Sequence, residues 1–221
     1  MGISSLPKYD RREVAVLIPA YNEEKLIKKT IQAAQNIGCV YVADDSSTDK
    51  TKEIALQTGA VVISAPYNMG KGDVLNYALP QTKEKIVLLI DADLEESCLE
   101  GQKLVEAVLE GADLSIGLFR SQGGFGLVRR LASLLLFFKT GHYFQAPLSG
   151  QRAAYKETWE KLQPFSSGFA LEVAMLKKAC FHRLNIVEIP VLMSDRNYGR
   201  GLYGIKHRLK QLIAVLKGVY L

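Results

Sequence analysis

Four short apolar runs in the first half of the chain are each followed by a polar motif, and a helical pattern follows each of the first three motifs. The runs cover residues 14–19, 39–43, 61–64 and 86–90. Short apolar runs rich in Val and Ile are typical of strands buried on both faces, and parallel strands need a long crossover, usually a helix. The alternation therefore predicts an α/β fold, with a mostly parallel central sheet and helices on both faces.

The alternation loosens beyond Gly111, where the expected elements are less regular. We expect strands at 114–119, 151–155 and 186–192, and helices at 127–140, 156–163, 168–182 and from about 202 to the C-terminus. No internal repeat, low-complexity tract or obvious linker divides the chain. The sequence therefore predicts a single domain over residues 1–221, with a first half at about 14–113 and a more specialised second half at about 114–221.

The positive charge of the chain is concentrated in two segments. Residues 114–156 and 196–221 each hold six Lys or Arg and no acid, whereas the whole chain has a net charge of only +5. The rest of the chain is therefore net negative. A solvated face is the simplest interpretation of such a run, but the lack of any acid favours a surface that attracts phosphate groups.

The cysteines and the apolar runs predict the compartment. Cys39, Cys98 and Cys180 form no CxxC pair, which is typical of reduced thiols in a cytoplasmic protein. The N-terminus lacks the apolar core of a signal peptide, and the longest apolar run, at 131–138, is far shorter than the ~20 residues of a membrane-spanning helix. We expect a cytoplasmic chain, either free in solution or lying on the inner membrane face.

The polar motifs at the strand ends are the strongest functional signal. They read PAYNEE (19–24), DDSSTD (44–49), NMGKG (68–72) and DADLEE (91–96). Each motif alone is explained by local structure, since Asn22 and either Thr48 or Asp49 are good helix N-caps and NMGKG suits a turn. Together they indicate a ligand site, because ligands bind at the carboxyl ends of the strands in open α/β sheets.

Asp91 and Asp93 suit a divalent cation. Residues two apart on an extended backbone point to the same side, and hard cations such as Mg²⁺ or Mn²⁺ prefer oxygen ligands. Such an ion needs a partner, and the glycines and Lys71 of NMGKG suit the oxygens of a diphosphate. The chain contains neither a P-loop nor a GxGxxG motif.

The order and spacing of these motifs resemble family 2 glycosyltransferases. The matching segments are VLIPAYNEEKLIKKTI, VADDSSTDKT, NMGKGDVLNYAL and IDADLEE. The resemblance implies a GT-A, Rossmann-like fold and a metal-dependent transfer of sugar from a nucleotide-sugar, with a UDP-sugar favoured and a GDP-sugar as the alternative. It also implies that the first half binds the nucleotide and the second half binds the acceptor.

The resemblance assigns roles to residues of the first half. It places Asp93 as the direct metal ligand, and Asp91 nearer the ribose or a metal-bound water. The other residues that it places around the nucleotide-sugar are Pro19, Ala20, Tyr21, Glu23, Asp45, Gly70, Lys71 and Ala92.

The second half resembles two groups within the family through PLSGQRAAY, SSGFALEVAM and VEIPVLMSDRNYGR. These are the polyprenyl-phosphate sugar transferases and the glucosyl-3-phosphoglycerate synthases, which implies a phosphate-bearing acceptor, either a polyprenyl phosphate or a small phosphorylated molecule. Asp195 stands where the second group has a histidine that completes the metal site. The resemblance places Ser149, Gly150, Gln151 and Arg152 near the acceptor or donor sugar. The charge of the basic segments makes Arg196 and Arg200 further candidates for binding the phosphate of the acceptor.

Glu172 is a lone acid in the apolar helical segment GFALEVAM. It is either turned to solvent or aimed into the site, where it would act as a general base if the reaction inverts the anomeric centre. The predicted catalytic residues are therefore Asp93, Glu172 and Gln151, the last at a position where many relatives carry an acid.

Two other functions and several partners remain open. The chain could bind a nucleotide-sugar without turnover, or, remotely, be a receiver-type signalling domain, although the motif order differs from that class. The apolar stripe of the basic C-terminal helix fits packing on the domain and equally an interfacial membrane helix. The expected partners are a nucleotide-sugar and a phosphate-bearing acceptor, with a membrane surface and a second copy of the chain as further candidates, and no nucleic acid.

Overall fold

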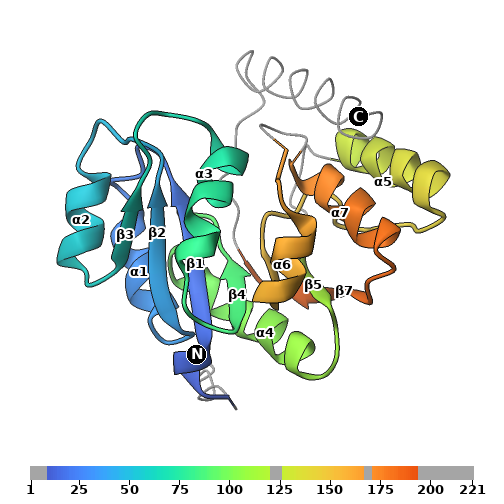
Figure 1. The fold of residues 1–221 in the computed structure, drawn as a ribbon, viewed down its shortest axis with the longest axis horizontal. Helices are drawn as coiled ribbons and strands as arrows, with labels where there is room; N and C mark the ends of the chain where they lie inside the picture. Colours follow the sequence, from blue (N-terminus) through green and yellow to red (C-terminus); the bar gives the residue numbers. More distant parts are fainter. Residues whose placement is uncertain (1–8, 120–125, 167–170, 194–221) are drawn as a thin grey trace.

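A central seven-stranded sheet organises the chain, and helices cover both of its faces (Figure 1). The computed structural model describes residues 9–119, 126–166 and 171–193. The strands are β1 (Val14–Ala20), β2 (Cys39–Asp44), β3 (Val61–Ser64), β4 (Ile86–Leu89), β5 (Leu114–Phe119), β6 (Arg152–Tyr155) and β7 (Ile186–Val191). The helices are α1 (Ile27–Ala34), α2 (Thr51–Gln57), α3 (Lys71–Ala78), α4 (Gln102–Leu109), α5 (Gly126–Thr140), α6 (Lys156–Leu162) and α7 (Leu171–Phe181), with 3₁₀ turns η1 (Arg11–Glu13), η2 (Leu79–Gln81) and η3 (Glu95–Gly101).

The strand order is β3-β2-β1-β4-β6-β5-β7. Strands β1 to β4 are parallel to one another where they pair, and so are β5 and β7. Strand β6 runs antiparallel to both of its neighbours, β4 and β5. The predicted α/β fold with a mostly parallel sheet is confirmed, and the same sheet contains strands from both halves of the chain.

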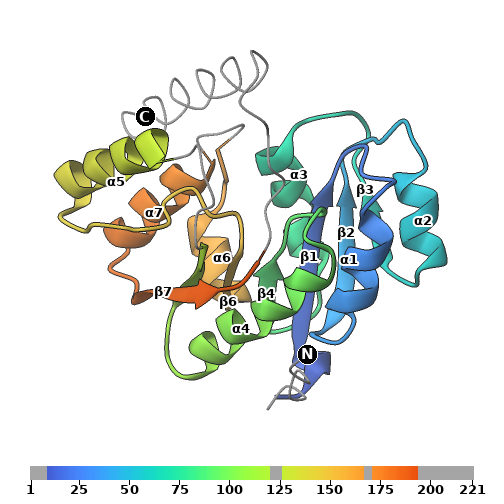
Figure 2. The ribbon, with the colours of Figure 1, turned by 180° about the vertical axis from the view of Figure 1, so that it is seen from behind.

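Two apolar cores lie on opposite faces of this sheet. Leu17 and Leu89 belong to the core under α3, α5, α6 and α7, whereas their neighbours Ile18 and Leu88 belong to the core under α1, α2 and α4. Successive residues of a strand point to opposite faces, so a fully apolar strand supplies both cores at once. Figure 2 shows α1 and α4 in front of the sheet, on the side away from α6.

Asn22 is not the N-cap of a helix, contrary to the sequence-based expectation. Helix α1 begins only at Ile27, and Asn22 has a φ of 55°, in the left-handed region that Asn tolerates better than most residues. Its side-chain Oδ1 accepts a hydrogen bond from the backbone N–H of Thr48 at 2.8 Å. The asparagine therefore ties two strand-end loops together instead of starting a helix.

None of the helices in the described ranges combines the length and the apolar character that crossing a membrane requires. The three cysteines are free thiols.

Candidate functional site

The loops after β1 and β2 are interlocked at one edge of the sheet. The backbone N–H of Asp45 donates to the carbonyl of Ala20 at 2.9 Å, and the N–H of Glu23 donates to Oγ1 of Thr51 at 2.7 Å. Pro19 and Ala20 end β1, and Tyr21 follows them with 46% of its surface exposed. The structure thus gathers the predicted nucleotide-binding residues of the first two motifs at the carboxyl ends of neighbouring parallel strands.

Asp45 joins the third motif to this edge. Its Oδ1 and Oδ2 accept the backbone N–H groups of Met69 at 2.7 Å and of Gly70 at 2.8 Å. Gly70 has a φ of +89°, a conformation that favours glycine, and it immediately precedes α3. The buried carboxylate of Asp45 therefore fixes the loop that presents Lys71, the first residue of α3.

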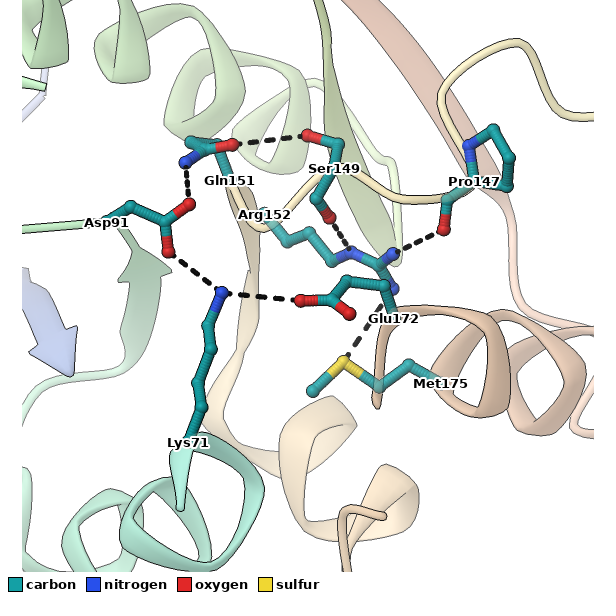
Figure 3. Close-up of polar contacts among 8 residues, drawn as sticks. All are labelled: Lys71, Asp91, Pro147, Ser149, Gln151, Arg152, Glu172 and Met175. Carbon is teal, nitrogen blue, oxygen red and sulfur yellow. Dashed lines mark hydrogen bonds and ion pairs between the residues drawn. The ribbon is translucent and has the colours of Figure 1, made fainter. Parts of the chain in front are cut away.

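Four side chains from distant parts of the chain meet at the end of β4 (Figure 3). Lys71 Nζ lies 2.8 Å from Asp91 Oδ1 and 3.3 Å from Glu172 Oε1. Gln151 donates from Nε2 to Asp91 Oδ2 at 2.6 Å. Helix α3, the segment after β4, the segment before β6 and the start of α7 each supply one member, so the site needs the complete fold.

The charges of this cluster stabilise one another. Burial acts to lower the pKa of Lys71, but the carboxylates of Asp91 and Glu172 outweigh it and raise that pKa. Burial likewise acts to raise the pKa of Asp91, and here the charge of Lys71 and the hydrogen bonds from Lys71 and Gln151 bring that pKa below its usual value. The ammonium and the carboxylate are therefore both charged at neutral pH, with 35% of each side chain exposed.

The backbone at Gly150 approaches this cluster closely. A Cβ atom on Gly150 would lie 2.8 Å from Asp91 Oδ2 and 2.8 Å from Lys71 Nζ, which is closer than real Cβ contacts come. A side chain at residue 150 would therefore push the ends of the Asp91 and Lys71 side chains out of their present positions.

Asp91 and Asp93 do not share one face of a strand, and that sequence-based expectation was wrong. Strand β4 ends at Leu89, and residues 92 and 93 form a turn. The buried Thr30 of α1 holds this turn, because its Oγ1 donates to Ala92 O at 2.8 Å and accepts from Glu95 N at 2.9 Å. Thr30 was not among the predicted site residues, since a threonine within a helical pattern carries no distinctive signal.

The described residues contain no group of three or more His, Cys, Asp or Glu side chains placed to hold a metal ion. Asp91 and Asp93 both belong to the segment that follows β4, and Mg²⁺ commonly uses one or two protein carboxylates together with substrate phosphates and waters. The donor set fits a cation that a diphosphate helps to hold. Asp195, Arg196 and Arg200 lie outside the described residues.

Arg152 is buried beneath the loop rather than presented to an acceptor. Only 1% of its surface is exposed, and its Nε and Nη2 donate to the carbonyls of Ser149 at 2.9 Å and Pro147 at 3.4 Å. Its Nη1 lies 3.6 Å from Met175 Sδ (Figure 3). Burial lowers the pKa of Arg152 to about 10, against the opposing charges of Glu172 and Glu188. The predicted acceptor contact is replaced by a supporting role for the loop.

Glu188 of β7, which was not among the predicted site residues, supports the same loop from its other end. Its carboxylate accepts the backbone N–H groups of Gln145 at 2.9 Å and of Ala146 at 2.6 Å. Ser149 and Gln151 are both buried, and the Ser149 hydroxyl donates to Gln151 Oε1 at 3.4 Å. Residues 145–151 are thus held from β6 and β7 while Gln151 holds Asp91.

Comparison with known proteins shows that the chain is similar in sequence to sugar transferases. The sequence profile described as glycosyl transferase family 2 matches residues 15–178. The chain is 32% identical to the glucosyl-3-phosphoglycerate synthase of Mycobacterium tuberculosis, over 75% of this chain and 60% of the synthase. It is 29% identical to the undecaprenyl-phosphate 4-deoxy-4-formamido-L-arabinose transferase of Edwardsiella ictaluri, over 87% of this chain and 63% of the transferase. The chain therefore spans less than two thirds of either relative.

The fold is also similar to a solved structure. The crystal structure of the M. tuberculosis synthase in complex with Mn²⁺, UDP-glucose and phosphoglyceric acid superposes with a TM-score of 0.78 at 30% identity. The match covers 95% of this chain and 80% of that one.

Proposed function

The chain belongs to glycosyl transferase family 2 and is a glycosyltransferase of the GT-A fold, and we propose that it transfers a sugar from a nucleotide-sugar to a phosphate-bearing acceptor with the help of Mg²⁺ or Mn²⁺. We favour a UDP-sugar as the donor, because the similar M. tuberculosis synthase binds UDP-glucose with Mn²⁺, and UDP with Mg²⁺. A GDP-sugar is the alternative donor.

The observation that carries this proposal is the convergence of Lys71, Asp91, Gln151 and Glu172 on one point (Figure 3). A nucleoside diphosphate presents phosphate oxygens, and here an ammonium group and a glycine-rich loop face the carboxyl ends of parallel strands, where such ligands bind. The interlocked loops that carry Pro19, Ala20, Tyr21, Glu23 and Asp45 would hold the nucleoside, with Gly70 and Ala92 beside the diphosphate and ribose.

The metal would be held by Asp93, with Asp91 beside it and Asp195 as a third candidate ligand. When bound, such a cation neutralises the negative charge that develops on the leaving nucleoside diphosphate. Lys71 adds a positive charge on the same side of the site, and Gln151 fixes the orientation of Asp91.

Glu172 is the candidate general base. It lies at the start of α7 with 14% of its side chain exposed, and its carboxylate faces Lys71 rather than bulk solvent. If the reaction inverts the anomeric centre and the acceptor reacts through a hydroxyl group, a carboxylate in this position can take the hydroxyl proton as the new bond forms and the nucleoside diphosphate leaves. A polyprenyl phosphate would instead react through an ionised phosphate oxygen, which has no proton for Glu172 to remove. Ser149 and Gly150, on the loop beside Glu172, would contact the acceptor or the transferred sugar.

The acceptor is proposed to bear a phosphate, as either a polyprenyl phosphate or a small phosphorylated molecule. Helix α5 supports the lipid alternative and a peripheral contact with an anionic membrane surface. Its exposed residues Arg130, Leu134, Phe137 and Phe138 are spaced at i, i+4, i+7 and i+8, on one helical face. Arg196 and Arg200 would add to the acceptor site, and a second copy of the chain is a further candidate partner.

A thermal-shift panel of UDP- and GDP-sugars, each with and without Mn²⁺, tests the proposal. A ligand bound only by the folded state raises the melting temperature, so one nucleotide-sugar should stabilise the chain when Mn²⁺ is present. If no nucleotide-sugar does so, the proposal is wrong. A chain that is stabilised but releases no nucleoside diphosphate with any phosphorylated acceptor would instead be a binding domain without turnover.

A further inference from the structure

Lys71 occupies the position from which a divalent cation would approach Asp91. Its Nζ lies 2.8 Å from Oδ1, while Oδ2 accepts the hydrogen bond from Gln151 at 2.6 Å. The close approach of Gly150 restricts the space beside Oδ2. Two positive charges a few ångströms apart repel one another strongly at a partly buried site. A cation held by Asp93 beside Asp91 is therefore repelled by the ammonium of Lys71 for as long as Lys71 stays paired with Asp91.

The same ammonium holds Glu172. Lys71 Nζ lies 3.3 Å from Glu172 Oε1, and the charges of Asp91 and Glu172 both raise the pKa of Lys71. One lysine thus bridges two carboxylates and offsets part of the repulsion between them. Its release would free both of them together.

Lys71 is well placed to exchange partners. It is the first residue of α3, it follows Gly70, and 35% of its side chain is exposed. Its four-carbon stem is flexible, and a diphosphate carries the negative charge that would attract its ammonium group. The neighbouring N–H groups of Met69 and Gly70 are already fixed by Asp45, so the side chain moves more easily than the loop.

We infer that Lys71 is an internal counter-ion that couples metal binding to nucleotide binding. The diphosphate of the donor draws Lys71 away from Asp91, which removes this repulsion from the cation site at Asp93 and Asp91 and releases Glu172. Metal and nucleotide then bind cooperatively, and by linkage each raises the affinity for the other by the same factor. This inference rests on the proposed nucleotide-sugar function and adds a role for Lys71 beyond contact with the diphosphate.

Mn²⁺ binding to the full chain, followed by the electron paramagnetic resonance of free Mn²⁺ with and without UDP, tests the inference. In the wild-type chain, UDP should tighten Mn²⁺ binding by about tenfold or more. In Lys71→Met, Mn²⁺ binding without UDP should be about tenfold tighter than in wild type, because the competing charge is gone. The gain that UDP brings should be correspondingly smaller in this variant.

Lys85→Met is the matched control. Lys85 Nζ lies 2.6 Å from Glu13 Oε1, at the opposite edge of the sheet, where β1 and β4 begin. This variant has the same change in net charge and also loses an ion pair, so its Mn²⁺ affinity should match wild type. Lys71→Arg keeps the competing charge and should bind Mn²⁺ alone no more tightly than wild type. Thermal melting verifies that each variant is folded.

Three results would overturn the inference. The first is a folded Lys71→Met chain that binds Mn²⁺ alone no more tightly than wild type. The second is a wild-type chain that binds Mn²⁺ equally well with and without UDP, a result that needs no variant. In both cases Mn²⁺ and UDP still bind, so the proposed function survives. A wild-type chain that binds neither Mn²⁺ nor UDP contradicts the proposed function itself, and the inference with it.

Discussion

Gln151 fixes Asp91 through a 2.6 Å hydrogen bond from Nε2 to Oδ2, although the two residues are 60 positions apart. The bond orients the carboxylate while leaving Gln151 neutral, which suits a position beside a second acid. Replacing this amide by a carboxylate, Gln151→Glu, would set two acids against each other and raise one of their pKa values. We expect the acidic limb of the transfer rate to move to higher pH in this variant.

Gln151→Ala is the control, since it removes the hydrogen bond without adding a charge. It should lower the transfer rate by about tenfold to a hundredfold and leave the acidic limb in place. The measurement is donor turnover across pH 5 to 9, by release of the nucleoside diphosphate. If Gln151→Glu shows the wild-type pH profile, the contact with Asp91 does not control its charge.

A methyl group at residue 150 should block the site without unfolding the chain. In Gly150→Ala, the new Cβ would meet Asp91 Oδ2 and Lys71 Nζ at 2.8 Å, so both side chains must move. The side chains of Lys71 and Asp91 are partly exposed and can shift at small cost to stability. We expect a melting temperature within a few degrees of wild type and loss of the stabilisation by nucleotide-sugar and Mn²⁺. Retention of that stabilisation would contradict the observed packing.

The burial of the Arg152 guanidinium leads to a different prediction. It distinguishes a residue that supports the loop from one that binds the acceptor directly. Arg152→Lys keeps the charge but cannot reach the carbonyls of both Pro147 and Ser149, because an ammonium lacks the guanidinium fork. Urea denaturation should show a loss of about 1 to 3 kcal/mol. A residue that only binds the acceptor would raise KM and leave the free energy of unfolding unchanged.

The strands and the position of the site could be predicted because they depend on local patterns. An apolar run such as residues 86–90 can only be buried, and polar residues directly after it must lie at the end of the strand. The place of β6 between β4 and β5 could not be predicted in this way. Its pairing depends on contacts distant in sequence, and Arg152 at its start gives the segment a polar appearance.

The contacts between the site residues were harder to predict than which residues belong to the site. Lys71, Gln151 and Glu172 were all expected near the site, but not that Lys71 would bridge to Glu172, 101 residues away. A charged residue near a ligand-binding motif is expected to contact the ligand. The sequence does not tell whether its side chain faces the ligand or another part of the protein. Burial separates the two cases, as it does for Arg152, and burial of a charged side chain has no local signal in the sequence.

The hydrogen bonds of Asp49 predict how the free energy of unfolding changes with pH. Its Oδ1 accepts from Thr51 N at 2.9 Å and its Oδ2 from Glu24 N at 3.1 Å. Burial acts to raise the pKa of Asp49, but the hydrogen bonds from the Thr51 hydroxyl and from the backbone N–H groups of Thr51 and Glu24 outweigh it and bring that pKa below its usual value. A carboxyl whose pKa is lower in the folded state stabilises the fold above its unfolded pKa, and the contribution is lost as pH falls through the folded pKa.

Asp49→Ala should therefore cost about 1 kcal/mol of unfolding free energy at pH 7, and less at pH 3. Urea denaturation at the two pH values measures the difference. Glu160→Ala, which removes an exposed acid on α6, is the control and should change stability little at either pH. An Asp49→Ala effect that is the same at pH 3 and pH 7 would show that the charge of Asp49 is not what stabilises these loops.

The exposed face of α5 predicts attachment to anionic lipid. Phe138 is 75% exposed and Leu134 46% exposed, and Arg130 lies on the same face. Aromatic side chains at a membrane surface insert among the lipid head groups while a basic residue pairs with the phosphates. Sedimentation with vesicles containing one third phosphatidylglycerol should recover the wild-type chain, and Phe138→Ser should bind several times more weakly. Leu56→Ser, which removes an exposed apolar residue on α2, should bind like wild type. Equal loss in both variants would point to general hydrophobicity, whereas equal binding by wild type and Phe138→Ser would remove α5 from the membrane contact and favour a small phosphorylated acceptor.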